Sequence, residues 1–255
     1  MTQTIFVAGA TGAIGSRLVA MLVSRGHRVF GMTRSQQAAG TLASVGALPV
    51  ICDVFDVPEL HAAMQRARPN IVVHQLTDLP RGLDADRMEE GIRRNARIRS
   101  EGTENLVAAA VAGGAHHIVV QSIAWAYAPG NPPYTEESPL DEGAQGLRAV
   151  SVRGIVALEK AVLNTPSLRG TVLRYGQIYG PGTGSIDAND KPLALHVDAA
   201  AWAAVLAVEL GRTGIFNIVG PNPEVTSDKA RRELGWDAER IPPRRRSAAG
   251  SMRAS

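Results

Sequence analysis

Short apolar runs rich in β-branched residues alternate with longer amphipathic segments over the first 125 residues. The runs predict buried strands, and the segments have a helical spacing of apolar positions that predicts helices between them. The expected strands lie at residues 4–9, 28–32, 48–52, 70–75 and 116–121, and the expected helices at 13–25, 36–45, 57–67 and 86–112. This alternation is typical of an α/β fold with a doubly wound parallel sheet, the Rossmann fold, whose ligand crevice lies at the carboxyl ends of the strands.

The second half of the chain has longer loops. Residues 126–146 and 180–192 are rich in Gly, Pro and acidic residues, which predicts loops beside the crevice. Further helices are expected at 147–163, 197–210 and 228–235, and further strands at 170–174 and 214–219. We therefore expect one dinucleotide-binding domain over residues 1–239, with a small C-terminal substrate-side subdomain drawn mainly from about 176–239.

Charge and composition indicate an ordinary globular protein. Apolar residues make up 45% of the chain and charged residues 20%, and no apolar stretch is long enough to span a membrane. The formal charge of +3 is local, because removing four arginines of the expected disordered tail at 240–255, Arg244, Arg245, Arg246 and Arg253, takes it to −1. We therefore expect neither a nucleic-acid partner nor a membrane partner.

Cysteine and histidine are scattered. Cys52 is the only cysteine, so no intrachain disulfide can form, which fits the reducing cytoplasm as the expected location. No group of histidines and cysteines has the spacing of metal ligands, so we expect no metal site.

A glycine motif follows the first expected strand and opens the first expected helix. It reads Gly9-Ala10-Thr11-Gly12-Ala13-Ile14-Gly15. Glycines at this place let the backbone approach a pyrophosphate, and the free N–H groups of the helix attract its charge. The spacing is G-x-x-G-x-x-G rather than G-x-G-x-x-G. We interpret the motif as a dinucleotide site, the alternative being a tight turn without a ligand.

The end of the second expected strand favours NADP(H). Dinucleotide folds that bind NAD place an acidic residue here, about twenty residues on, against the ribose hydroxyls. The chain instead has Thr33, Arg34 and Ser35. Arg34 can pair with a 2′-phosphate and stack on adenine, and the two hydroxyls can bind the phosphate. NAD(H) is the weaker alternative, in which Arg34 is a solvated surface charge.

Motifs along nearly the whole chain resemble the short-chain dehydrogenase/reductase superfamily, and within it the extended NAD-dependent epimerase/dehydratase branch. They are the glycine motif, Asp53 after the third strand, Val72-Val73-His74, Leu173-Arg174-Tyr175-Gly176, Tyr179-Gly180-Pro181-Gly182, His196-Val197-Asp198 and the segment 229–236.

The resemblance implies a set of cofactor residues beyond the glycine motif. Asp53 and Val54 would meet the adenine. Further along, the cofactor would be lined by Gln75, Leu76 and Thr77, then by Gln121 and Ser122, and at the nicotinamide end by Tyr175, Gly176, Gln177 and Ile178. Ser122 falls at the family's catalytic Ser/Thr position. The resemblance also implies a homodimer built by the helices at 86–112 and 147–163.

Two departures set the chain apart from this family. Family members carry a catalytic Tyr-x-x-x-Lys pair, but alignment on Glu159 puts Ser151 and Ile155 at those positions, and no tyrosine in the chain stands four residues before a lysine. The segment 180–196, where extended members build their substrate lobe, is also short, which predicts a small-molecule substrate.

Two functions remain open. The first is an atypical NADP(H)-dependent oxidoreductase or epimerase-like enzyme acting on a small carbonyl or hydroxyl compound, in which Ser122 binds the carbonyl oxygen and Tyr127 or Tyr134 donates the proton. Tyr127 can equally be a packed loop aromatic. The second is a catalytically inactive NADP(H)-binding sensor or regulatory module, which the missing pair favours.

Overall fold

The computed structural model describes residues 2–189 and 191–240, and seven parallel strands form its main sheet. The strands are β1 (Thr4–Ala8), β2 (Arg28–Thr33), β3 (Leu48–Ile51), β4 (Ile71–His74), β5 (His117–Ile123), β6 (Arg169–Tyr175) and β9 (Gly214–Ile218). Their order is β3-β2-β1-β4-β5-β6-β9, so the direction of winding reverses between β1 and β4. This confirms the predicted α/β fold with a doubly wound parallel sheet. It also puts a ligand crevice at the carboxyl ends of β1 and β4.

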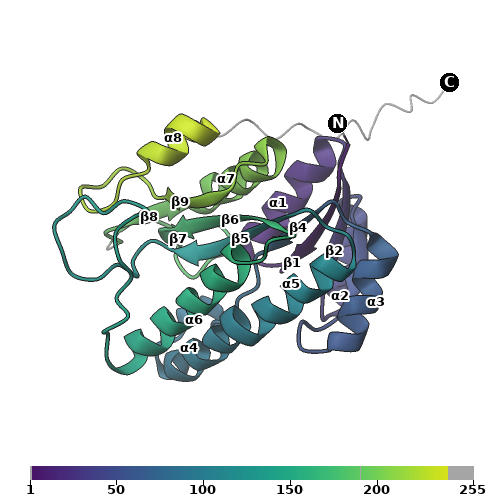
Figure 1. The fold of residues 1–255 in the computed structure, drawn as a ribbon, viewed down its shortest axis with the longest axis horizontal. Coiled ribbons are helices and arrows are strands. Elements are labelled where there is room, and N and C mark those ends of the chain that lie inside the picture. The colour runs from purple at the N-terminus through teal and green to yellow at the C-terminus, as the bar shows by residue number, and fades with distance from the viewer. Residues whose placement is uncertain (1, 190, 241–255) are drawn as a thin grey trace.

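Helices cover both faces of the sheet (Figure 1). One layer contains α1 (Ala13–Ser24), α2 (Gln36–Ser44) and α7 (Val197–Leu210), and the other contains α3 (Val57–Ala67), α5 (Thr103–Ala112) and α6 (Gly146–Leu163). Within β1, Ile5 and Val7 pack into the first layer while Phe6 and Ala8 pack into the second, all of them fully buried. A strand with two buried faces needs a continuous apolar run, which is why β1 has no polar alternation.

The expected single helix at 86–112 is divided in the structure. It comprises α4 (Met88–Arg97), the π-helical segment η3 (Ile98–Gly102) and α5. Short 3₁₀ turns, η1 (Arg81–Leu83) and η2 (Ala85–Arg87), precede α4. The helix packs closely on α6, since a Cβ on Gly154 would lie 3.1 Å from Cα of Ala96.

The outer face of α4 carries charge. Arg93 pairs with Glu89 at 2.9 Å, and Arg97 pairs with Glu101 in the following segment at 2.7 Å. These four side chains are about half exposed or more. Such a face does not offer the apolar seam on which the expected homodimer was based, and the homodimer stays a prediction.

Three smaller elements of the second half of the chain lie outside the main sheet. The strands β7 (Gln177–Tyr179) and β8 (Ala194–His196) form a separate parallel pair, and α8 (Asp228–Leu234) follows β9. The sequence did not predict β7 and β8, because three residues are too few to show an alternation of apolar and polar positions. The predicted basic tail lies, apart from Arg240, outside the described residues.

A buried ion pair joins α6 to the sheet. Arg174 on β6 donates to Glu159 on α6 through Nη2 at 2.7 Å and Nε at 2.9 Å, and both residues are at most 5% exposed. The Ser122 hydroxyl donates to the same carboxylate at 2.7 Å. Arg174 Nη1 also donates to the hydroxyl of Tyr127, which donates to Oδ1 of Asn217 at 2.6 Å. The network thus ties α6, β5, β6, β9 and the loop after β5 together.

Replacing one partner of this pair should strongly destabilise the fold. Glu159→Gln leaves the Arg174 guanidinium without its counter-charge in a dry interior, which typically costs about 3–5 kcal/mol. Ser122→Ala removes one hydrogen bond to the carboxylate and should cost about 1–2 kcal/mol. Urea unfolding followed by circular dichroism measures both, and a Glu159→Gln variant as stable as the parent would contradict the assignment.

Candidate functional site

The glycine motif is packed against the end of β4. After β1 the chain turns at Gly9, whose φ is +84°, and the Gly12 N–H donates to the Gly9 carbonyl at 3.1 Å. A Cβ on Gly9 would lie 2.5 Å from the backbone carbonyl of Gln75, and one on Gly15 would lie 2.0 Å from the Gly9 oxygen. Side chains at these two positions therefore collide with backbone, and the loop keeps the form that a pyrophosphate requires.

The helix that follows presents free N–H groups. Gly12 is the N-cap of α1 and, having no side chain, leaves the first turn without a side-chain cap. The first turn of α1 also contains no acidic residue. The uncapped N–H groups and the helix dipole make this end of α1 suited to bind an anion.

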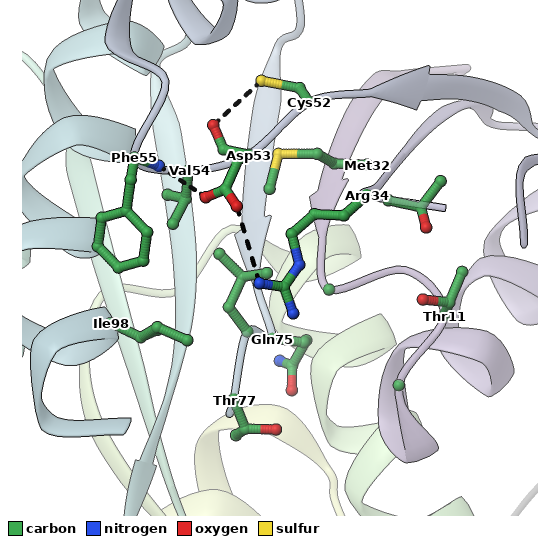
Figure 2. A pocket seen from close by; sticks show the side chains of 14 residues that line it. Thr11, Met32, Arg34, Cys52, Asp53, Val54, Phe55, Gln75, Thr77 and Ile98 are labelled. Carbon is green, nitrogen blue, oxygen red and sulfur yellow. Dashed lines mark hydrogen bonds and ion pairs between the residues drawn. The ribbon is translucent and has the colours of Figure 1, made fainter. Parts of the chain in front are cut away.

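A pocket opens beside this helix end, and Figure 2 shows the side chains that line it. The lining comes from the loop after β1, the end of β2, the segment after β3, the segment after β4 and η3. The residues are Gly9, Thr11, Gly12, Met32, Thr33, Arg34, Cys52, Asp53, Val54, Phe55, Gln75, Leu76, Thr77 and Ile98.

Arg34 and Asp53 face each other across this pocket (Figure 2). Arg34 Nη1 lies 3.7 Å from Asp53 Oδ2, and the side chains are 65% and 39% exposed. The other carboxylate oxygen of Asp53 accepts the Phe55 N–H at 3.0 Å, which orients the side chain. A pair this exposed contributes little to stability, so the guanidinium is free to bind a better anion.

Thr33 and Ser35 have structural bonds of their own. Ser35 is the N-cap of α2 and accepts the Ala38 N–H at 3.3 Å, while its own N–H donates to Thr33 Oγ1 at 3.2 Å. Next to the pocket, burial raises the pKa of the Cys52 thiol to about 11, so the thiol is protonated at neutral pH. Its Sγ lies 3.3 Å from the Asp53 carbonyl as a donor.

The far end of the crevice holds buried polar atoms without a well-aligned hydrogen bond. The side-chain amide of Gln75 and the hydroxyl of Tyr175 lie within reach of each other without forming a well-aligned hydrogen bond, and among the described residues Oε1 of Gln177 has no partner. Burial raises the pKa of Tyr175 well above its ordinary value. Because buried polar groups are nearly always satisfied in a functioning protein, these atoms point to a polar ligand group at this end, such as a carboxamide.

Ten of the residues predicted to bind the cofactor line the pocket. The structure adds Met32, Cys52, Phe55 and Ile98. Met32, Cys52 and Phe55 are neighbours of predicted residues, whereas Ile98 comes from η3 and no sequence signal indicated it. The predicted residues outside the pocket lining are Ala13, Ile14, Gly15, Ser35, Gln121, Ser122, Tyr175, Gly176, Gln177 and Ile178.

Ser122 and Tyr127 belong to the buried network instead of the pocket. Ser122 is 3% exposed and its hydroxyl is directed to Glu159, while Tyr127 is 6% exposed. Burial raises the pKa of Tyr127 above its ordinary value. Gln121, which precedes Ser122 in the sequence, points in another direction, and its Nε2 donates to the Leu76 carbonyl at 3.0 Å beside the pocket.

The position of the family's Tyr-x-x-x-Lys pair is apolar or neutral here. Ser151 is buried, and Ile155 packs with Ile123, Ala126 and Val152 in a small apolar cluster. None of the residues in this cluster can give or take a proton. The absence of the pair, which rests on the alignment at Glu159, stays a prediction.

Two histidines on strands of the main sheet are buried against threonines. His74 and His117 are fully buried and lie 3.1 Å from Thr103 Oγ1 and 2.8 Å from Thr171 Oγ1. Burial lowers the pKa of each to about 4, which keeps both neutral. In the part of the chain that the structure describes, we find no group of three potential metal ligands and no helix able to cross a membrane.

Comparison with known proteins relates the chain to one family and to a named reductase. The profile of the NAD dependent epimerase/dehydratase family matches residues 5–227. A Streptomyces protein named 3-diazoavenalumate denitrifying reductase is 41% identical over 240 residues, which cover 86% of this chain and 76% of that protein.

Solved structures show the same fold at low sequence identity. The UDP-glucose 4-epimerase of Thermotoga maritima superposes with a TM-score of 0.73 at 19% identity and covers 92% of this chain and 93% of its own. The dTDP-glucose 4,6-dehydratase of Streptomyces venezuelae gives 0.74 at 20% identity, with 92% of each chain covered. Fold, family profile and the Streptomyces relative agree, and the chain belongs to the NAD-dependent epimerase/dehydratase family.

Proposed function

We propose that this protein is a reductase that uses NADP(H) in preference to NAD(H) and removes the diazo group of a small aryl diazonium carboxylate as N2. The observation that carries the proposal is the apolar cluster around Ile155, where the family has its proton-transferring pair. A relative with 41% identity that is named a denitrifying reductase of a diazo carboxylate supports the same chemistry.

The reaction balances without an acid or base. When bound, the nicotinamide supplies a hydride to the substrate. A carbonyl that accepts hydride becomes an alkoxide and needs a proton, which explains the pair in related enzymes. An aryl diazonium ion needs none, because the new C–H bond forms as the C–N bond breaks and its electron pair leaves with N2. An apolar wall suffices for this step, and it also keeps water away from a cation that water destroys.

The residues of the crevice fit a dinucleotide. The close-packed Gly9 and the uncapped α1 suit the pyrophosphate, and the buried polar groups of Gln75 and Tyr175, which are not well aligned with each other, suit the carboxamide of the nicotinamide. Arg34 can exchange its exposed partner Asp53 for a 2′-phosphate, to which guanidinium binds in two-pronged fashion. The N-terminus of α2, which follows directly, adds a favourable dipole.

Gly12→Asp should separate folding from cofactor binding. The backbone of Gly12 is extended, and a Cβ there would be 3.4 Å from the Gly9 oxygen, so the side chain has room. An aspartate would cap α1 and stabilise the protein by about 0.5 kcal/mol, yet its charge would repel the pyrophosphate and weaken binding about a hundredfold. Thermal unfolding and calorimetric titration with NADPH measure the two effects.

The matched control for this variant is Gly12→Asn, which has nearly the same shape without the charge. It should lose clearly less affinity than Gly12→Asp. Normal NADPH binding by Gly12→Asp would show that the N-terminus of α1 is not the pyrophosphate site.

Arg34→Ala should lower the affinity for NADP(H) about tenfold or more and the affinity for NAD(H) by clearly less, since both cofactors lose stacking on adenine but only NADP(H) loses the partner of its 2′-phosphate. Asp53→Asn should increase the preference for NADP(H) over NAD(H), because it frees Arg34 from a competing carboxylate. Isothermal titration of both cofactors tests this, and equal affinities in the parent protein would refute the preference.

The reaction can be tested with labelled reagents. With 15N-labelled 3-diazoniobenzoate and NADPH that carries deuterium at C4, the protein should release one 15N2 per NADPH consumed and place the deuterium on the ring carbon. Headspace and product mass spectrometry follow both labels. The folded Gly12→Asp variant corrects for reduction without enzyme, and a rate no higher than with that variant would leave a cofactor-binding module without turnover.

A further inference from the structure

A buried arginine in the π-helical segment η3 has no partner. Arg99 is only 9% exposed, and no hydrogen bond or ion pair from residues 2–189 or 191–240 reaches its side chain, whose nitrogens are not fully enclosed and keep some accessible surface. Among the described residues, the other deeply buried arginine, Arg174, is fully paired with Glu159. Transferring an unpaired charge from water into a protein interior is costly, so such a residue needs an explanation.

The neighbours of Arg99 on the helix show which way its face is turned. Asn95, one turn earlier, accepts the Asp78 N–H at 3.2 Å, and Thr103, about one turn later, lies 3.1 Å from Nε2 of His74. The helix face that carries Arg99 therefore lies against residues 74–78. This is the segment that lines the pocket after β4.

The other neighbour of η3 is α6, which packs directly against it. This helix carries Ile155, the residue that aligns with the family's lysine. Arg99 thus brings a positive charge to the region between the end of β4 and the apolar cluster on α6. A π-helical segment inside a longer helix is itself frequent at functional sites.

Electrostatics around Arg99 leave the charge uncompensated. Burial lowers its pKa to about 10, which still keeps the guanidinium charged at neutral pH. On the facing segment, the Asp78 carboxylate is paired with Arg94 at 3.2 Å, and burial and Arg99 together lower the pKa of His74 to about 4, so this histidine is neutral. The cofactor's own phosphates have the N-terminus of α1 and Arg34 as their proposed partners.

We propose that Arg99 binds the carboxylate of the substrate and so selects small organic acids. The two-pronged geometry of a guanidinium matches the two oxygens of a carboxylate, and the ligand's charge would satisfy the buried cation. The inference rests on the proposed function for the identity of the reacting group, but carboxylate selection holds for any reaction at this site.

The test compares charged and neutral ligands that cannot react. In the presence of NADP+, the parent protein should bind trans-cinnamate and benzoate at least about tenfold more tightly than cinnamamide and benzamide, as one charge-assisted pair is worth about that factor. Arg99→Gln should abolish the difference, Arg99→Lys should restore part of it, and NADP+ affinity should stay within about twofold. Titration calorimetry and ligand-observed NMR measure these quantities.

Thermal unfolding adds a readout that a structural arginine would not give. In the absence of ligand, Arg99→Met should raise Tm by about 2–4 °C, because it removes an uncompensated buried charge. Arg174→Met, the matched change at the paired arginine, should lower Tm. Adding cinnamate should raise Tm of the parent but leave Tm of Arg99→Met unchanged.

Several results would overturn the proposal. They are equal binding of acids and amides by the parent, unchanged discrimination in Arg99→Gln, or a loss of NADP+ affinity in that variant with cinnamate binding intact. A lower Tm of ligand-free Arg99→Met would also count against it. None of these depends on N2 release, so carboxylate selection can hold even if the diazo chemistry fails.

Discussion

The contact between the Gly9 backbone and the carbonyl of Gln75 is the constraint on which the site depends. A single Cβ at Gly9 would lie 2.5 Å from that carbonyl, and a Cβ at Gly15 would lie 2.0 Å from the Gly9 oxygen. These contacts hold the loop between β1 and α1 against the end of β4, where the strand order reverses. The close packing of this loop on β4 directs the uncapped N-terminus of α1 toward the crevice. The other pocket residues lie around that helix end.

The sequence predicted most of the fold because its signals are local. Apolar runs mark strands that are buried on both faces, apart from the largely exposed edge strand β3, and glycines mark the turn after β1. The strands β7 and β8 are held by the register between Gln177–Tyr179 and Ala194–His196, which is a long-range property. The π-helical segment was also missed, because the apolar spacing over 86–112 is compatible with an unbroken α-helix.

For the site, the sequence identified positions but not the directions of side chains. Gln121 and Ser122 are adjacent, yet alternation along β5 sends the first toward Leu76 at the crevice and the second toward Glu159 on α6. Which side faces the cofactor depends on the register of β5 in the sheet. Likewise, Arg34 and Asp53 were both recognised, but their pairing results from β2 and β3 ending side by side.

The two buried arginines illustrate how this protein distributes charge. Arg174 and Glu159 occupy the interior between β6 and α6 with nearly every polar atom bonded, so this part of the network is fixed and has no capacity for a ligand. Arg99 lies on η3, which packs against α6, and its side chain has no hydrogen bond or ion pair among the described residues. In such a site the cation can bind the carboxylate at one end of a substrate. The apolar surface around Ile155 then keeps water away from the reacting group at the other end. For a diazonium group this division is required by the chemistry, since a nucleophile or a base placed there would compete with hydride for the same carbon.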